Sequence, residues 1–396
     1  MPRKVSEEEL SDLVHVLKEV EDPRVEGRCK HLLIDILIIT VCAVLCRAES
    51  IAEIEEFGQV KFEWLSRFLD LPHGIPSHDP IARVLYLIDP EQLELLFNQW
   101  VMSTIKGKLK TISIDGKSSK GTDRRFNGKH RPLHMVSAYS HEFGLSLCQS
   151  ASKSSGNAEV EAAKECIKQL DLRNVTVLAD AGLNSKKIIS QIREQKGHYI
   201  VPIKTNHKRR LQELDELFTS YTGTSSTTID RGHARYERRK CRVLSVQKMS
   251  DRFKEKWVDA KSVFVITRKR REKDKRYVLQ KTGEDGKQYY ERNTGEFRES
   301  ETQTYFVSSK KLTADQALVE ARKHWGIENK LHWVLDVAFQ EDNWTVKAKR
   351  VARNLSSVRK IALNIIRSNT SKGSIRIKMK RAGWNESFLE ELVFGT

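Results

Sequence analysis

The chain has 396 residues, which is long enough for two or three domains with cores of their own. Its 70 lysine and arginine residues outnumber its 53 aspartate and glutamate residues, so the formal net charge is +17 at pH 7. So large a basic excess predicts a polyanionic partner, with nucleic acid favoured over a membrane surface.

Secretion, membrane insertion and a disulfide framework are all disfavoured. The N-terminal residues are charged throughout, unlike those of a signal peptide. The longest apolar run, residues 32–46, includes Asp35 and is too short for a transmembrane span. The six cysteines are scattered without a pairing pattern, which suits a reducing compartment. We therefore expect a cytoplasmic, nucleoid-associated protein with no membrane partner.

Residues 1–106 are predicted to form an N-terminal helical domain. Apolar side chains recur with helical spacing over residues 32–46 and 50–70, and prolines and a glycine within 72–76 interrupt the pattern. Further helices are expected from about residue 79 and across residues 91–106.

The pattern changes at Lys110, and residues 107–206 are predicted to form the first part of an α/β catalytic core. Three early strands joined as hairpins, followed by strands that alternate with helices, predict a mixed sheet flanked by helices. The expected strands cover residues 111–116, 133–140, 145–150, 175–179 and 198–204, and the expected helices cover 157–170 and a segment from about 184.

Two aspartates occupy equivalent places in this pattern. Asp115 and Asp180 each end an apolar strand and are each followed by a small residue and a turn. Because sites in α/β sheets lie at the carboxyl ends of strands, the two carboxylates can converge if their strands are neighbours. A single aspartate in such a place is more often a turn or cap residue than a catalyst.

Residues 312–370 are predicted to form the second part of the core, beginning with a helix. Thr313 and Gln316 have the spacing of a capping box. Glu328 lies at the centre of the apolar face of this helix, so it needs a cation, a donor or a metal ion as a partner. A buried salt bridge is the simplest alternative. A second helix is expected over residues 353–368. The predicted apolar face contains Leu318, Ala321, Trp325, Glu328, His332 and Leu335.

Residues 207–311 are strand-rich and strongly charged, and are predicted to form a β-rich insertion. Its most basic segment, residues 231–240, includes an aromatic residue and suits backbone contacts and base stacking. No acidic residue lies between Asp342 and Glu386, so this stretch, which runs into a basic C-terminal tail at 371–396, predicts a phosphate-binding surface. The predicted DNA-binding residues are Lys117, Lys120, Lys204, Arg235, Arg238, Arg239, His324, Lys330, Lys347, Lys349 and Arg350.

The three acidic residues suggest metal chemistry. Three carboxylates brought together need a counter-charge, and hard oxygen ligands favour Mg²⁺ or Mn²⁺. Two such ions suit an in-line phosphoryl displacement. A basic protein with an acidic metal-binding centre is what DNA strand cleavage and strand transfer require. The predicted catalytic and metal-binding residues are Asp115, Asp180 and Glu328.

Several segments carry a family resemblance across nearly the whole chain. They include DPRVEGRCKHLLIDIL and GIPSHDPIARVL near the N-terminus, then ISIDGKSSKGT, VLADAGLNSKKI, HYIVPIKTN, RGHARYERRK and NLSSVRKIALNIIR. The most specific is HWGIENKLHWVLDV. With these segments the chain resembles bacterial insertion-sequence transposases of the H-repeat-associated (ISAs-type) group, within the DDE superfamily.

The resemblance implies an RNase H-like catalytic core interrupted by a β-rich insertion, with an associated N-terminal helical domain. It matches Asp115, Asp180 and Glu328 to the acidic triad, which would bind two Mg²⁺ or Mn²⁺ ions. The wider superfamily often has Tyr, Arg and Lys around the glutamate, where this chain has Ala321, His324 and Leu335. His324 could replace the arginine in gripping a terminal phosphate.

The leading hypothesis is a transposase that cleaves and joins double-stranded DNA at terminal inverted repeats and target sites, acting as a homodimer or larger assembly. An RNase H-like nuclease without strand transfer would use the same carboxylates. A catalytically silent DNA-binding relic would keep the basic surface. A mononuclear metal site on His324, Glu328 and His332 is a further alternative, since these residues recur at steps of four.

Overall fold

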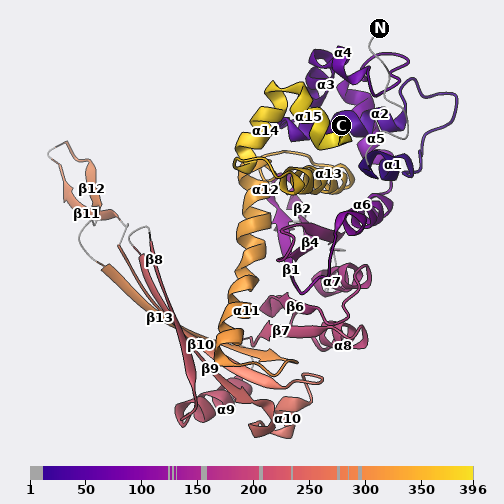
Figure 1. Ribbon diagram of the computed structural model, residues 1–396. Coiled ribbons are helices and arrows are strands. Elements are labelled where there is room, and N and C mark those ends of the chain that lie inside the picture. The colour runs from indigo at the N-terminus through magenta and orange to yellow at the C-terminus, as the bar shows by residue number, and fades with distance from the viewer. Residues whose placement is uncertain are drawn as a thin grey trace. The chain divides into compact units, whose positions relative to one another are not determined.

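The computed structural model describes residues 12–123, 125–126, 129–130, 132–152, 158–204, 208–232, 235–273, 277–283, 285–292 and 297–395. The chain divides into two compact units. Unit 1 comprises Met1–Val177 and Trp325–Thr396, and unit 2 comprises Leu178–His324 (Figure 1).

The N-terminal part of unit 1 is helical, as predicted. Its α2 is almost entirely buried, which confirms the long apolar run as a core helix. Among the described residues, no helix combines the length and apolar character that a membrane span requires. The helices are α1 Asp12–Lys18, α2 Leu33–Leu45, α3 Ile51–Val60, α4 Phe62–Leu65, α5 His78–Leu87 and α6 Pro90–Thr104.

The remainder of unit 1 contains one side of a mixed sheet, in the order β5-β4-β1-β6. The strands are β1 Thr111–Ser119, β4 Leu133–Ser140, β5 Ser146–Ala151 and β6 Thr176–Ala179, and helix α7 Ala158–Lys168 packs on β4 and β5. β1 pairs antiparallel with β4, and β4 with β5, through the hairpin turn predicted at residues 141–144. A small hairpin, β2 Arg125–Phe126 and β3 Lys129–His130, follows β1.

Within unit 2 the strand order is β7-β13-β10-β9-β8. The strands are β7 His198–Pro202, β8 Ser225–Gly232, β9 Arg235–Ser245, β10 Ser262–Lys273 and β13 Phe297–Ser308. Helices α8 Lys186–Glu194, α9 Lys208–Thr219 and α10 Asp251–Lys254 accompany them, and β11 Tyr277–Thr282 pairs with β12 Gln288–Arg292.

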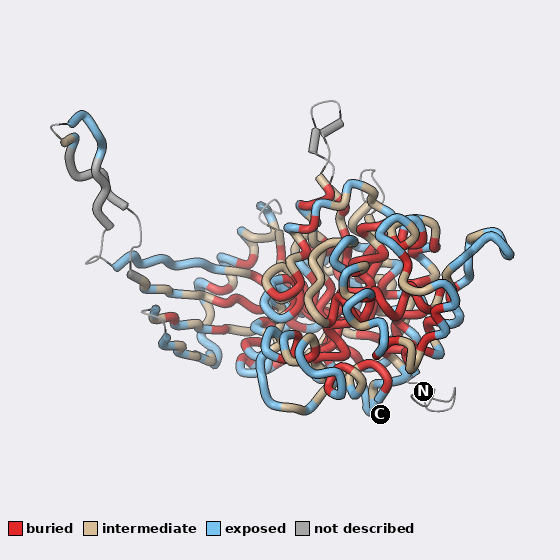
Figure 2. Tube along the Cα trace, turned by 90° about the horizontal axis from the view of Figure 1, so that it is seen from above, coloured by how far each residue is buried: buried red, intermediate tan, exposed pale blue. Residues whose placement is uncertain are grey.

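The long strands of unit 2 have a buried half and an exposed half. Phe264 of β10 stacks on Phe306 of β13 with ring centroids 4.9 Å apart, inside an apolar core. Residues 297–303 of β13 are exposed, whereas its last four residues are buried (Figure 2). The predicted β-rich insertion is therefore present. Sequence periodicity did not predict α9, α10 or the β11–β12 hairpin.

The helix that begins at Thr313 has the predicted start and an unpredicted interruption. The Thr313 amide donates to Gln316 Oε1 at 3.0 Å and the Gln316 amide to Thr313 Oγ1 at 3.3 Å, which confirms the capping box. α11 Ala314–Ile327 then passes into a π-helical turn, Glu328–His332, before α12 Trp333–Ala338.

The prediction that Glu328 is buried on the apolar face of this helix is wrong. Leu318, Ala321 and Leu335 are buried as expected, but Glu328 is exposed and Trp325 is 37% exposed. A π turn bonds residue i to i+5 and accommodates one extra residue, so positions four apart no longer share a face through it.

Part of the acid-free segment after Asp342 is buried in the fold, although Lys347 is exposed. Helix α13 Lys349–Ser368 is buried along most of its length, including Arg359 and Lys360. Acids from other elements compensate these cations. Arg353 donates Nε to Glu94 Oε1 of α6 at 2.7 Å, and Arg359 NH1 lies 3.8 Å from Glu341 Oε1. Apolar periodicity predicted this helix correctly. The absence of acidic residues in the local sequence predicted exposed cations, whereas most of the helix is buried.

The described part of the predicted basic C-terminal tail, residues 371–395, contains two helices. α14 Ile375–Trp384 and α15 Glu386–Phe394 form a helical pair. Phe394 stacks on Phe68 with ring centroids 4.1 Å apart, and Glu386 pairs with Lys61 at 2.8 Å. The C-terminal helices thus close over the N-terminal ones.

We expect Arg353→Met to lower the free energy of unfolding by about 3–5 kcal/mol, because it leaves the buried Glu94 carboxylate without its cation. Burial already raises the pKa of Glu94 despite the opposing effect of Arg353. Urea denaturation followed by tryptophan fluorescence measures the change.

The double variant Glu94→Gln/Arg353→Met should recover part of that loss. Lys168→Met, which removes a pair with Glu165 whose side chains are 58% and 53% exposed, is the matched surface control. If Arg353→Met lowers the free energy of unfolding no more than this control does, Arg353 does not stabilise the fold through Glu94.

Candidate active site

Asp115 lies in the middle of β1 rather than at its end, because the strand continues to Ser119. Its neighbour across the sheet is Ser137 of β4. The Asp115 side chain is 16% exposed, and its Oδ1 accepts the Gly116 amide at 2.9 Å. Strand alternation places Asp115 and Lys117 on one face of the sheet and Gly116 on the other.

No side chain larger than hydrogen fits at Gly116 without displacing its neighbours. A Cβ there would lie 2.4 Å from Glu159 Oε1 and 2.5 Å from His134 Nε2, which are themselves 3.2 Å apart. Glycine at this position therefore allows the His134–Glu159 pair to pack directly behind Asp115. No sequence pattern singled out either His134 or Glu159.

The segment that carries Glu328 packs against the Asp115 face of β1. Ser113 Oγ contacts His141 Nε2 at 2.7 Å, and a Cβ on Gly326 would lie 2.7 Å from His141 Cε1. Farther along, His332 Nδ1 lies 3.5 Å from Asp115 Oδ2. Unit 1 thus brings Asp115 and the Glu328 turn together. A π-helical turn of this kind often marks a functional site.

His332 is the residue of this site whose role sequence reasoning missed. It is 9% exposed, and its Nε2 has no hydrogen-bond partner among the described residues. Burial, followed by the charges of Lys360 and Lys117, lowers the pKa of His332 to about 3. The imidazole is therefore neutral at physiological pH beside Asp115. The sequence signals for His332 were its position within the most specific motif of the chain and its place on the predicted helix face.

The mononuclear metal alternative is wrong for the same structural reason that exposes Glu328. The π turn leaves Glu328 exposed while His332 is buried, so the spacing of four does not align them. Across the described ranges of both units, no three His, Cys, Asp or Glu residues form a group able to hold a metal ion. The assignment of Asp115, Asp180 and Glu328 as ligands stays a prediction.

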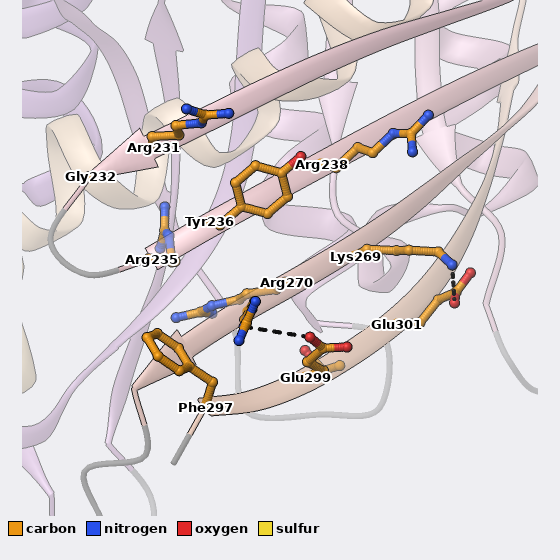
Figure 3. Close-up of a pocket in the computed structure, with 12 residues that line it drawn as sticks. Arg231, Gly232, Arg235, Tyr236, Arg238, Lys269, Arg270, Phe297, Glu299 and Glu301 are labelled. Carbon is orange, nitrogen blue, oxygen red and sulfur yellow. Dashed lines mark ion pairs between the residues drawn. The ribbon is translucent and has the colours of Figure 1, made fainter. Parts of the chain in front are cut away.

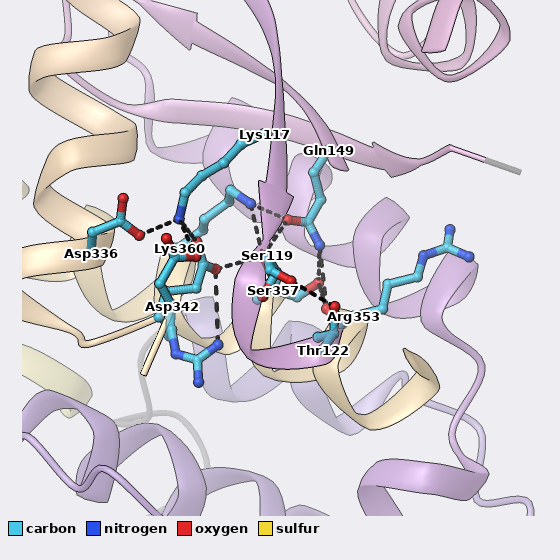
Figure 4. A network of polar contacts seen from close by, with 12 residues as sticks. Lys117, Ser119, Thr122, Gln149, Asp336, Asp342, Arg353, Ser357 and Lys360 are labelled. Atoms are coloured by element: carbon cyan, nitrogen blue, oxygen red, sulfur yellow. Dashed lines mark hydrogen bonds and ion pairs between the residues drawn. The ribbon is translucent and has the colours of Figure 1, made fainter. Parts of the chain in front are cut away.

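An ion-pair network is centred on the half-buried Lys117, two residues after Asp115 on β1; Figure 4 shows the network. Lys117 Nζ contacts Asp336, Glu341 Oε2 at 2.8 Å and Asp342 Oδ1 at 3.6 Å. Burial disfavours the charged lysine, but Glu341 and Asp336 outweigh it and raise the pKa of Lys117. The ion pairs of Lys117 connect β1 to the chain that follows Glu328. The ammonium group is therefore engaged by carboxylates and does not suit the predicted phosphate contact.

Glu341 is the buried acidic centre of the network. Ser356 Oγ donates to its Oε1 at 3.1 Å, and Lys360 Nζ donates to the same hydroxyl at 3.0 Å. Burial alone would raise the pKa of Glu341, but Lys117, Lys360 and Arg359 lower it to about 2. The carboxylate is therefore ionised in the folded protein at neutral pH.

Asp180 belongs to unit 2, directly after β6. Its carboxylate accepts the amides of Ala181 and Gly182, capping a short 3₁₀ turn, and the residue is exposed. Lys204 is half-buried and donates Nζ to Gly182 O at 3.4 Å. Within unit 2, Lys204 thus contacts the loop that begins at Asp180.

The predicted basic segment of β9 lines a hollow of about 1040 Å³ on the exposed half of the unit 2 strands (Figure 3). Arg238 is exposed there, and Arg231 lies over the Tyr236 ring at 5.7 Å. Arg235 is half-exposed and lies 3.6 Å from Glu237. The other lining residues are Gly232, Lys269, Arg270, Arg271, Phe297, Glu299, Ser300 and Glu301.

Arg239 differs from its neighbours, because it is only 14% exposed and pairs with Asp230 and Glu237. It stabilises the strands of unit 2 from within. The DNA-binding prediction therefore fits Arg238 and Arg235 better than Arg239.

The other predicted DNA-binding residues differ in how freely their charges face solvent. Lys120 is 83% exposed, near Asp342, and Lys330 and Lys347 are exposed. Arg350 donates to the carbonyls of Leu87 and Ile88 at the end of α5, which gives it a structural role. Lys349 and His324 are half-buried.

Comparisons with known proteins cover both parts of the chain. The family described as DDE_Tnp_1-associated matches residues 14–101, and the family described as Transposase DDE domain matches residues 106–365. The chain is 32% identical over 394 residues to a protein of Escherichia coli O157:H7 named putative transposase YncI, covering 97% of this chain and 95% of the relative.

A second relative, the H repeat-associated putative transposase YhhI of Escherichia coli K12, is 28% identical over 395 residues, covering 98% of this chain and 99% of the relative. Among solved structures, a cryo-EM structure of a piggyBac transposase synaptic complex with hairpin DNA matches with 9% identity and a TM-score of 0.43. That match covers 98% of this chain and 78% of the other.

The Lys117 network should make the stability of the protein depend on pH. A Glu341 pKa lowered from 4.5 to about 2 adds stability that is complete above pH 4.5 and is lost as the pH falls towards 2. The size is on the order of 3 kcal/mol. We expect Glu341→Gln to flatten the loss of unfolding free energy between pH 5 and pH 2.5, measured by urea denaturation.

The matched control is Glu165→Gln, whose carboxylate is 53% exposed. The control should keep the pH slope of the wild type. Equal slopes for Glu341→Gln and wild type would show that Glu341 does not carry this dependence.

Proposed function

The chain belongs to the DDE transposase family, and on that premise we propose that it cleaves phosphodiester bonds at the ends of an insertion element and joins the freed ends to target DNA. The observation that carries the proposal is the packing of the Glu328 turn against the strand that bears Asp115. This packing places the turn that bears Glu328 against the strand that bears Asp115, although the two carboxylates are far apart in the sequence.

The chemistry of the donor set suits Mg²⁺ or Mn²⁺. Asp115 accepts a backbone amide and lies beside a neutral imidazole, while Lys117 on the same face is held by Glu341. Carboxylate oxygens are the ligands that these hard cations prefer. Asp115, Asp180 and Glu328 would hold two ions, which when bound would stabilise the charge that develops on the attacking and leaving oxygens.

The side chains around the carboxylates would position them. His332 lies beside Asp115 Oδ2, and the His141 ring contacts Ser113 of β1 at the point where Gly326 passes. The two contacts would fix the register between β1 and the Glu328 turn. Small errors in such register slow phosphoryl transfer, because its catalysis depends on positioning.

DNA would be held by exposed cations in both units. In unit 2, Arg238 and Arg231 in the basic hollow suit phosphates, and Tyr236 suits a base. In unit 1, Lys120, Lys330 and Lys347 are exposed. The proposed substrate is double-stranded DNA that carries the terminal inverted repeats. The proposal also includes an RNase H-like core, action at the nucleoid and assembly into at least a dimer.

The test uses a labelled duplex that carries the element's own end. In Mg²⁺ or Mn²⁺ the wild type should nick it at the element boundary. Asp115→Asn and Glu328→Gln should slow cleavage by about 10³-fold or more, because each removes charge that stabilises the transition state, while DNA affinity stays within a few-fold. Asp115→Cys should recover partly in Mn²⁺ and not in Mg²⁺, since Mn²⁺ tolerates sulfur better.

Glu56→Gln, at an exposed position on α3, is the matched control and should cleave like the wild type. Joint loss of binding and cleavage would make Asp115 and Glu328 structural residues. Wild-type binding without cleavage in either metal would favour the silent DNA-binding relic. Cleavage without joining would favour a nuclease.

A further inference from the structure

A second basic hollow lies in the N-terminal helical part of unit 1. Its volume is about 890 Å³, and it is formed by residues 23–31, which precede α2, and by residues of α5. We call it the α5 groove. Among its described lining residues there is one acid, Asp79, and there are four lysine or arginine residues. These cations are Arg24, Arg28, Lys30 and Arg83.

Three of the four cations are not neutralised by neighbouring acids. Arg28, Lys30 and Arg83 are exposed, and in the part of the chain that the structure describes none of them forms an ion pair. Arg24 differs, because Asp22 accepts hydrogen bonds from its Nε at 2.8 Å and from its NH2 at 2.7 Å. The α5 groove therefore holds more positive charge than its single acidic lining residue offsets.

The His31 side chain lines the groove among these charges. Its Nδ1 is buried and has no hydrogen-bond partner among the described residues. Burial lowers the pKa of His31 most, a backbone hydrogen bond with Gly74 raises it, and the charges of His73, Arg24 and Lys30 lower it further. Surroundings that disfavour one more positive charge are those that favour an anion.

Hydrogen bonds hold the α5 side of the groove in place. At the C-terminal end of α5, Arg350 of α13 donates Nε to Ile88 O at 3.2 Å and NH2 to Leu87 O at 3.0 Å. At the other end, Glu55 of α3 accepts the His78 amide at 2.7 Å. The groove is thus built on a fixed helix, which reduces the ordering that a bound ligand must bring about.

We propose that Arg28, Lys30 and Arg83 bind phosphates of the DNA backbone in the α5 groove. The inference rests on the proposed function and adds to it a DNA contact in the N-terminal helices. A guanidinium matches the paired oxygens of a phosphate, and an ammonium group supplies a point charge.

The residues of the groove suit the DNA backbone rather than the bases. No Phe, Tyr or Trp is present among its described lining residues, whereas Tyr236 and Phe297 line the hollow of unit 2. Phosphate contacts fix the position of a duplex without reading its sequence. The α5 groove should therefore contribute equally to the binding of specific and unrelated DNA.

The experiment measures the affinity of the full-length protein for a duplex with the element's end and for an unrelated duplex of equal length. It is carried out without divalent metal over a range of salt concentrations. Arg28→Met and Arg83→Met should each weaken the binding of both duplexes about 5-fold. The slope of log K against log salt should fall in magnitude by about 1 for each variant and by about 2 for the double variant. Arg83→Lys, which keeps the charge, should restore the slope.

Removing the acid of the groove should have the opposite effect. Asp79→Asn should strengthen binding about 2-fold or more, because this carboxylate, 89% exposed, repels the phosphates. Arg173→Met is the matched control, since Arg173 lies in unit 1 outside the groove, is 73% exposed and is paired with Asp171. It should change the affinity by less than about 2-fold.

Cys29 gives a second measure on the unmodified protein, because its thiol is exposed and lines the groove. Bound DNA should slow the alkylation of Cys29 by N-ethylmaleimide, read by mass spectrometry. An alkylation rate that saturating DNA leaves unchanged would overturn the inference.

If wild type binds DNA but Arg28→Met and Arg83→Met behave like Arg173→Met, the phosphate site is refuted and the proposed function stands. If wild type does not bind DNA, the proposed function fails as well. A loss of affinity confined to the element's own end would indicate base readout and overturn the phosphate assignment. Binding of polyglutamate that needs Arg28, together with DNA binding that does not, would identify an acidic protein segment as the ligand and overturn the inference.

Discussion

The ion pairing of the half-buried Lys117 is the interaction on which the geometry of unit 1 depends. It lies two residues after Asp115 on β1 and pairs with Asp336 and Glu341, which follow the Glu328 turn. Arg359 and Lys360 of α13 then surround Glu341. Ion pairs thus connect β1, α13 and the segment that carries Asp336 and Glu341. Displacing any of these elements would leave the buried Glu341 carboxylate with fewer partners. Asp115 and the Glu328 turn thereby keep a fixed register.

Local sequence signals predicted the elements well and their burial less well. The Thr313–Gln316 capping box and strand β4 follow from short-range patterns, and the structure confirms both. No such pattern predicts the π turn at Glu328. Regular α-helical spacing therefore predicted that the Glu328 carboxylate would be buried. The acid that neutralises Arg353 is Glu94, more than 250 residues earlier, which no local reading of charge could reveal.

The two units contribute different parts of the proposed chemistry. Unit 1 supplies Asp115, the Glu328 turn and the network that holds them. Unit 2 supplies Asp180 and the basic hollow on its long strands. Arg353 and Arg359 of α13 are thus paired with acids inside the fold, whereas Arg235 and Arg238 of β9 are exposed. The net charge of +17 alone predicts a polyanionic partner without locating the surface that meets it.

The most direct measurement is anomalous diffraction from a crystal of the protein with its end duplex and Mn²⁺. The account predicts Mn²⁺ peaks about 2.1 Å from carboxylate oxygens of Asp115, Asp180 and Glu328. Mn²⁺ bound instead at His134 and Glu159, with the Asp115 and Glu328 carboxylates bare, would contradict it.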